Sequence, residues 1–110
     1  MLVPLRSSGR FAEIYRDGVS RRHGAVTVFQ ATGTAGSTRV GVVAGKKVGS
    51  AVQRNRAKRR LREALRRVEI PDGLDVVVVA SPGVLTAPFP TLVDWLGDAL
   101  EAKPMTMEAR

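Results

Sequence analysis

Apolar side chains recur at helical spacing in three parts of the chain, and each part predicts a helix. The first helix is expected from about residue 8 to residue 16. The second begins after Ser50, a favourable N-cap, and continues to about Val68. The third is expected to begin at Thr91, which forms a Thr-x-x-Asp capping pair with Asp94. The apolar faces are made by Phe11, Ile14 and Tyr15; by Ala57, Leu61, Ala64, Leu65 and Val68; and by Leu92, Trp95, Leu96, Ala99 and Leu100.

The segments between these helices predict strands. Residues 25–31 are rich in β-forming side chains, and a glycine-rich, hairpin-type loop at 33–37 leads to a returning strand at 39–43. Residues 75–80 contain a continuous apolar run, which is typical of a strand that is central in a sheet or buried on both faces. The order of elements is α-β-β-α-β-α, to which an extra short strand could be added, and it favours the α+β class and a small sandwich.

Length and composition restrict the possibilities further. A chain of 110 residues with 44% hydrophobic side chains predicts one domain, 1–110, with a loose N-terminus at 1–8 and a frayed tail at 103–110. The sequence has no cysteine, which excludes disulfides and cysteine-based zinc sites. No apolar run approaches the roughly 20 residues of a membrane span, and no signal-peptide pattern is present. We therefore expect a cytoplasmic protein with no membrane partner.

Positive charge is concentrated in the second predicted helix. Residues 1–68 carry 16 basic and 3 acidic side chains, whereas residues 69–110 carry 2 basic and 7 acidic ones. The segment 54–67 alone holds eight Lys or Arg residues and one acid, Glu63. Solvated helices usually mix acids with bases, because like charges at i,i+4 repel. This charge density favours a polyanionic partner, and nucleic acid is the simplest interpretation.

The basic side chains surround the apolar stripe of that helix. Asn55, Arg59, Arg62 and Arg66 lie directly opposite the stripe on a helical wheel. Arginine outnumbers lysine seven to one in residues 54–67, which suits bidentate contacts with phosphates and stacking on bases. The charge pattern does not distinguish DNA from RNA.

The aromatic residues allow two interpretations. Phe11 and Tyr15 share one face of the first predicted helix, and Phe29 lies on the strand that follows. All three can belong to the core, or they can form a platform on which unpaired bases stack. The pattern of residues leaves both possibilities open.

No catalytic constellation emerges from the remaining polar residues. His23, the only histidine, lies in a polar run and is interpreted as a solvated turn residue. Asp72 with Asp75, and Asp94 with Asp98, are spaced so that each pair could share a cation, but we interpret them as solvent-facing. We therefore do not expect this polypeptide to supply reactive groups for chemistry on RNA.

A long motif resembles the signature of a known family. The bacterial ribonuclease P protein subunit carries a strand, a KKxG-x-AV-x-RNR-x-KR segment and an RE pair on the following turn. Residues 40–43 and the ungapped run 46–63, KKVGSAVQRNRAKRRLRE, match this signature. Weaker similarity extends to Phe11-x-x-x-Tyr15 with Gly18, to Phe29, and to the strand that begins at Asp75.

The resemblance implies a fold and a function. The fold would be a two-layer α/β sandwich like the second domain of ribosomal protein S5, with a left-handed βαβ crossover that general connection rules do not predict. The chain would be the small subunit of ribonuclease P, the ribonucleoprotein that removes the 5′ leader of precursor tRNA. Catalysis with bound Mg²⁺ would reside in the RNA subunit. The implied partners are the RNA subunit and precursor tRNA, and DNA is not expected.

The resemblance also implies roles for individual positions. The following residues match the segment that faces the RNA subunit and the basic loop before it: Arg54, Asn55, Arg56, Lys58, Arg59 and Arg62, with Lys46 and Lys47. The following residues match aromatics of the cleft that takes the leader: Phe11, Tyr15 and Phe29. This match favours the platform interpretation of the aromatic residues.

Three features depart from the family pattern. Ala44-Gly45 stands where a Val-Ser pair is usual, and the short N-terminal segment has only Arg6 and Arg10 where members often carry several basic residues. The last predicted helix is acidic where many members are basic. We therefore expect RNA contacts in the first two thirds of the chain.

Other classes of protein remain as alternatives. A ribosomal or ribosome-assembly protein could use the same basic surface, and its aromatic residues would then be buried. A DNA-binding module would place 54–67 in a major groove and usually dimerise, but no apolar dimer seam is evident. A protein-only nuclease is the least favoured class, because carboxylates do not cluster.

Overall fold

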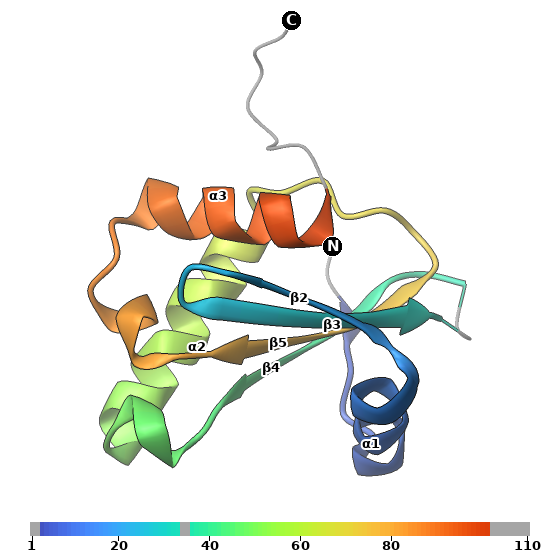
Figure 1. The fold of residues 1–110 in the computed structure, drawn as a ribbon, viewed down its shortest axis with the longest axis horizontal. Coiled ribbons are helices and arrows are strands. Elements are labelled where there is room, and N and C mark those ends of the chain that lie inside the picture. Colours follow the sequence, from blue (N-terminus) through green and yellow to red (C-terminus); the bar gives the residue numbers. More distant parts are fainter. Residues whose placement is uncertain (1–2, 34–35, 102–110) are drawn as a thin grey trace, which may run out of the picture.

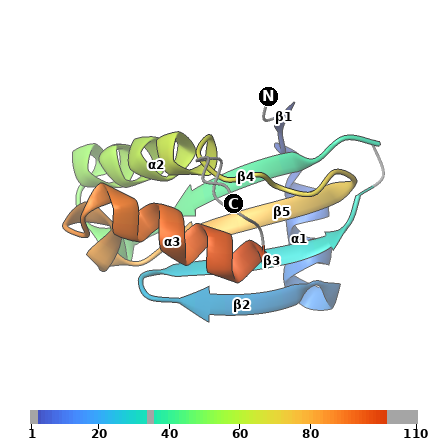
Figure 2. The same cartoon turned by 90° about the horizontal axis from the view of Figure 1, so that it is seen from above.

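The computed structural model describes residues 3–33 and 36–101 and consists of one mixed sheet with helices on both faces (Figure 1). The strand order is β1-β4-β5-β3-β2. Helices α2 and α3 cover one face, and α1 packs on the opposite face at one end (Figures 1 and 2). The elements are β1 (Val3–Pro4), α1 (Ser8–Asp17), β2 (Val19–His23), β3 (Val26–Thr32), β4 (Arg39–Ala44), the 3₁₀ turn η1 (Lys46–Val48), α2 (Ala51–Leu65), β5 (Leu74–Ala80), the 3₁₀ turn η2 (Pro82–Leu85) and α3 (Phe89–Leu100). The predicted α+β sandwich is confirmed.

Strand β5 is central, as its continuous apolar run predicts. Val76 and Val78 belong to the main core under α2 and α3, whereas Val77 belongs to a smaller core under α1, and all three are fully buried. β5 pairs in parallel with β4 and antiparallel with β3. The hairpin predicted at 33–37 is therefore wrong, because β3 and β4 lie on opposite sides of β5.

The hairpin in this part of the chain joins β2 to β3. Its turn contains Gly24, whose φ is +57°, and a Cβ atom there would lie 1.9 Å from the Trp95 ring of α3. Glycine therefore allows both the turn and the close approach of α3. The turn predicted around His23 is wrong, since His23 ends β2. An edge strand with one solvated side lacks the apolar alternation that would have revealed it.

The connection from β4 through α2 to β5 is left-handed, as the family resemblance implies (Figure 2). In that view α2 lies in front of the sheet, and β4 and β5 both point to the left. The chain passes from β4, the upper strand, through α2 to β5 below it. Most parallel connections are right-handed. The start of α2 lies beside the end of β4, because only the short turn η1 joins them.

Three element boundaries differ from the predictions. Helix α2 ends at Leu65 and not near Val68. The N-terminal segment expected to be loose forms β1 against β4, and Leu5 is buried at 4% exposure. Helix α3 begins at Phe89 after Pro88, and no side chain caps it, so the predicted capping role of Thr91 is wrong. Pro90 lies in the first turn of α3, where a missing backbone amide costs nothing. The predicted tail at 103–110 lies outside the described residues.

No helix within residues 3–33 and 36–101 combines the length and the apolar character that spanning a bilayer requires.

Candidate nucleic-acid interface

The basic helix α2 begins at a well-defined cap. The Ser50 side chain accepts a hydrogen bond from the Gln53 amide at 3.2 Å, and the Gln53 side chain accepts one from the Ser50 amide at 2.8 Å. This reciprocal capping box confirms the predicted N-cap. Gly49 before it has φ +142°, and a Cβ atom there would lie 1.9 Å from Gln53 Oε1. The cap fixes the orientation of the turn η1 relative to the helix. Lys46 and Lys47 of this turn are exposed.

The two faces of α2 are divided as the wheel predicts. Every residue of the predicted apolar stripe is at least 97% buried, against β4, β5 and α3. On the opposite face Asn55, Arg59 and Arg62 are exposed, and so is Arg56 beside them. Within the described part of the chain, these four side chains make no hydrogen bond or ion pair. The structure therefore leaves a row of uncompensated positive charge on the outside of the helix.

Two of the eight basic residues make contacts with other elements of the protein instead. The guanidinium group of Arg60 donates hydrogen bonds to the carbonyl oxygens of Val84 and Ala87, the latter at 2.7 Å. The guanidinium carbon of Arg67 lies 5.5 Å from the centre of the Phe89 ring, which is a cation–π contact. These arginines attach η2 and the start of α3 to α2, so they contribute less to an anion-binding surface than their charge suggests.

The remaining basic residues of the segment are intermediate cases. Arg54 and Lys58 are partly buried. Arg54 Nη1 donates a long hydrogen bond, 3.4 Å, to the Gly49 carbonyl oxygen. Arg66 is exposed and forms an ion pair with Glu63 at 2.9 Å. The free positive charge is thus centred on Arg56, Arg59 and Arg62.

The three aromatic residues form a cluster on the other face of the sheet. Tyr15 packs edge-on against Phe29 with ring centres 4.9 Å apart, and Phe11 lies 6.4 Å from Tyr15. Tyr15 is 42% exposed, and Phe11 and Phe29 are partly buried. Partial burial raises the pKa of the Tyr15 hydroxyl above its ordinary value. The cluster is therefore neither a closed core nor a fully open platform.

Helix α1 covers only part of this face. Phe29 faces Val77 and Gly41 across the sheet, and Phe11 packs on Gly41, where a Cβ atom would lie 2.5 Å from its ring. The next row toward the open end of the sheet consists of residues that are half-buried or exposed, in register: Arg22, Thr27, Val79 and Val43. β4 ends one residue later and leads to Lys46. A partly apolar strip therefore runs from the aromatic cluster toward the basic turn η1.

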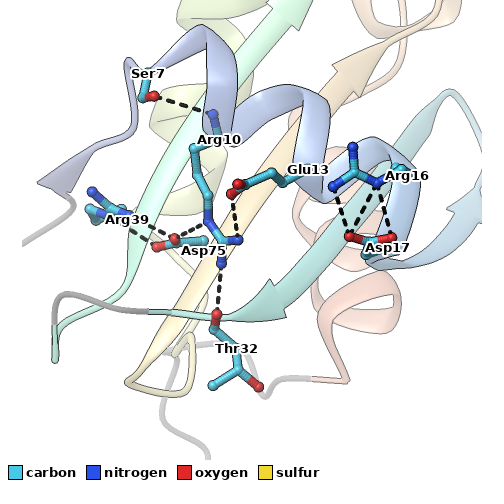
Figure 3. A network of polar contacts seen from close by, with 8 residues as sticks. All are labelled: Ser7, Arg10, Glu13, Arg16, Asp17, Thr32, Arg39 and Asp75. Carbon is cyan, nitrogen blue, oxygen red and sulfur yellow. Dashed lines mark hydrogen bonds and ion pairs between the residues drawn. The ribbon is translucent and has the colours of Figure 1, made fainter.

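A buried ionic cluster lies at the opposite end of the same face (Figure 3). Asp75 is completely buried and accepts hydrogen bonds from Arg39 at 3.0 and 2.7 Å and from Arg10 at 2.8 Å. The hydrogen bonds from Arg39, and then the one from Arg10, hold the pKa of Asp75 below its ordinary value of 3.8, although burial acts in the other direction.

The interpretation of Asp75 as a solvent-facing partner of Asp72 was wrong. A buried carboxylate is stable when hydrogen-bonded cations surround it, and both cations come from distant parts of the sequence. The one local sign is an aspartate inside an otherwise apolar strand. Among the described residues, no three His, Cys, Asp or Glu side chains are grouped so that they could hold a metal ion.

The basic helix and the aromatic cluster thus lie on opposite faces of one sheet. Helix α2 begins at the end where β4 runs into η1, whereas the aromatic cluster lies with α1 toward the other end (Figure 1). A small α+β sandwich with positive charge gathered on one helix belongs to the class of basic domains suited to a nucleic-acid partner.

Comparison with known proteins is more specific. The family model described as Ribonuclease P matches residues 3–103. The ribonuclease P protein component of Symbiobacterium thermophilum is 45% identical over 91 residues, covering 80% of this chain and 79% of that protein. The component from Kocuria rhizophila is 44% identical over 92 residues, covering 80% of each. The chain therefore belongs to the ribonuclease P protein family, whose role is in tRNA 5′ processing by a ribonucleoprotein endoribonuclease.

Solved structures agree on the fold. The RNase P protein from Thermotoga maritima superposes with a TM-score of 0.78 at 28% identity, covering 96% of this chain and 98% of that one. The Staphylococcus aureus protein gives a TM-score of 0.76 at 23% identity, covering 92% and 94%, which supports the fold alone.

Proposed function

We propose that this chain binds the ribonuclease P RNA subunit through the outer face of α2 and holds the 5′ leader of precursor tRNA on the α1 face of the sheet. The observation that carries the first half is the row formed by Asn55, Arg56, Arg59 and Arg62, which is exposed and finds no partner among residues 3–33 and 36–101. A rigid helix that presents arginines without acidic partners is stabilised by phosphates, which release their counterions on binding. Arg54 and Lys58 flank this row, and Lys46 and Lys47 extend it beyond the cap.

The second half of the proposal rests on the aromatic cluster and the strip beside it. A single-stranded leader is extended, has exposed bases and carries one phosphate for each nucleotide. Tyr15 and Phe29 offer ring edges and faces for a base, with Phe11 behind them. The half-buried row that includes Val43 and Val79 gives the next bases an apolar surface, and Lys46 lies at its end for a phosphate.

The chemistry is assigned to the RNA subunit. The described carboxylates do not form a site suited to Mg²⁺, and the buried one is bound to two arginines. Mg²⁺ would therefore be bound mainly by the RNA subunit, and this chain's residues would bind and orient the two RNAs. We place this work in the cytoplasm, with the RNA subunit and precursor tRNA as partners.

The decisive experiment is cleavage of precursor tRNA by a bacterial ribonuclease P RNA at low Mg²⁺, with and without this protein. The proposal predicts cleavage at the 5′ end of the mature tRNA only when both components are present. Tight RNA binding without rescue of cleavage would favour a ribosomal or general RNA-binding role. Cleavage by the protein alone would refute the assignment of chemistry to the RNA.

A further inference from the structure

The ionic cluster formed by Arg10, Arg39 and Asp75 lies outside the surfaces assigned above. One of its members, Arg10, belongs to α1, the helix that carries Phe11 and Tyr15. We propose that Arg10, held by the buried Asp75, is a positioning residue that fixes α1 on the sheet so that Tyr15 and Phe29 together accept a leader base. The inference rests on the proposed leader-binding role and names a residue that determines precursor specificity without touching the leader.

Arg10 forms hydrogen bonds with two strands and with its own helix (Figure 3). Its Nε donates to Asp75 Oδ2 of the central strand at 2.8 Å, and its Nη2 donates to the Thr32 carbonyl at the end of β3 at 2.7 Å. Its Nη1 donates to Glu13 on its own helix at 3.2 Å. The guanidinium group therefore fixes the first turn of α1 relative to the two strands on which the helix lies.

Little else holds α1 in place. Ile14 is its single buried residue, and it packs in a small core with Leu5 and Val77. Phe11 is partly buried above Gly41. By contrast, α2 contributes four fully buried residues to the main core. A helix held by so small an apolar contact depends more on its polar attachment.

The position of α1 determines the geometry of the aromatic cluster. Tyr15 comes from α1 and Phe29 from β3, and their rings meet edge-on at 4.9 Å. Arg10 is five residues before Tyr15, so rotation or displacement of the helix at Arg10 moves the Tyr15 ring relative to Phe29. Stacking depends on such distances, because the attraction falls quickly with separation.

The geometry of Asp75 explains why this attachment is rigid. Its two oxygens are already oriented by Arg39, which is its register partner on β4. Arg10 therefore binds a carboxylate that does not move with α1. Gly33 completes the arrangement, since a Cβ atom there would lie 3.2 Å from Asp75 Oδ1 and 3.0 Å from the Gly73 carbonyl oxygen.

The test compares Arg10→Gln with Arg16→Gln in the reconstituted holoenzyme. Both variants remove one positive charge from α1, but Arg16 is exposed and pairs with its neighbour Asp17. Asp75 keeps its bidentate Arg39 partner in both, so the sheet should remain folded. We expect Arg10→Gln to reduce the preference for precursor over mature tRNA by about tenfold. Affinity for the RNA subunit and kcat at saturating substrate should not change.

Two further measurements separate positioning from direct contact. If Arg10 acts through α1, the salt dependence of precursor binding is unchanged, whereas loss of a phosphate contact lowers its slope by about one. Amide exchange in α1 should accelerate in Arg10→Gln but not in Arg16→Gln, with α2 unaffected. Arg10→Lys, which can still reach one oxygen of Asp75, should recover part of the preference.

The outcomes also distinguish this inference from the proposed function. If the wild-type holoenzyme shows no preference for precursor tRNA, the leader-binding role itself fails. If the wild type shows the preference and Arg10→Gln keeps it, or if Arg16→Gln loses as much, the positioning role of Arg10 is refuted. A lowered salt slope in Arg10→Gln alone would make Arg10 a direct leader contact and would also overturn the proposal.

Discussion

Arg39 binds both oxygens of Asp75, from Nε to Oδ1 at 3.0 Å and from Nη2 to Oδ2 at 2.7 Å. The two residues are also register partners on the parallel strands β4 and β5. A bidentate arginine–carboxylate pair is directional, so it favours one alignment of the strands over a slipped one. This pair therefore joins the strand before the left-handed crossover to the strand after it.

Asp75→Asn is expected to destabilise the protein strongly. The amide keeps the shape of the side chain but removes the buried negative charge that both arginines bind and turns an NH₂ group toward their donors. Breaking a buried pair in this way costs about 3–5 kcal/mol, and the partial exposure of the arginines favours the lower end. Urea unfolding measures the change, and Asp72→Asn, at an exposed turn position, is the matched control. Equal stability of the two variants would show that the cluster adds little.

The same cluster predicts acid sensitivity. The pKa of Asp75 in the folded protein is depressed below 3.8, mainly by Arg39 and then by Arg10. A depressed carboxyl pKa stabilises the fold above the unfolded-state pKa, and that contribution is lost as pH falls through the folded-state pKa. Stability should therefore be constant near neutral pH and decline below about pH 4. The decline should be smaller in Asp75→Asn, which can be measured by urea unfolding between pH 6 and pH 2.5.

The sequence predicted the elements with local signals. The stripe from Ala57 to Val68, the Ser50 cap and the apolar run of β5 all depend on residues a few positions apart, and each is found as expected. The exposed row on α2 follows from the same helical period. The resemblance to the ribonuclease P family added the crossover, which no local pattern contains.

The features that the sequence did not predict depend on distant contacts. Asp75 meets Arg10 and Arg39, which lie 65 and 36 positions away, and no spacing rule connects them. The hairpin at 33–37 was inferred from its glycines, but β5, which comes later in the chain, separates the two strands. Arg60 looked like one more surface charge because its carbonyl partners belong to a turn that follows β5.

Arg59 and Arg60 should respond in opposite ways to substitution by alanine. Arg59 is exposed and unpaired within the described residues, so Arg59→Ala should leave stability unchanged and lower the salt slope of RNA-subunit binding by about one. Arg60 donates to two carbonyl groups, so Arg60→Ala should cost about 1–2 kcal/mol of stability and leave the slope nearly unchanged. Urea unfolding and a salt titration of binding decide both. A loss of slope in Arg60→Ala without loss of stability would contradict this division.

Phe29→Ala tests the aromatic cluster itself. The ring lies 4.9 Å from Tyr15, and its backbone belongs to a strand paired on both sides, so its loss should leave the sheet intact. If a leader base stacks there, precursor tRNA binding should weaken by about 1–3 kcal/mol, with little change for mature tRNA. Gln30→Ala is a control on the same strand, since successive side chains of a strand point to opposite faces and Gln30 therefore lies away from the proposed leader surface. Equal losses for precursor and mature tRNA would indicate a folding defect, and no loss for either would exclude Phe29 from the leader surface.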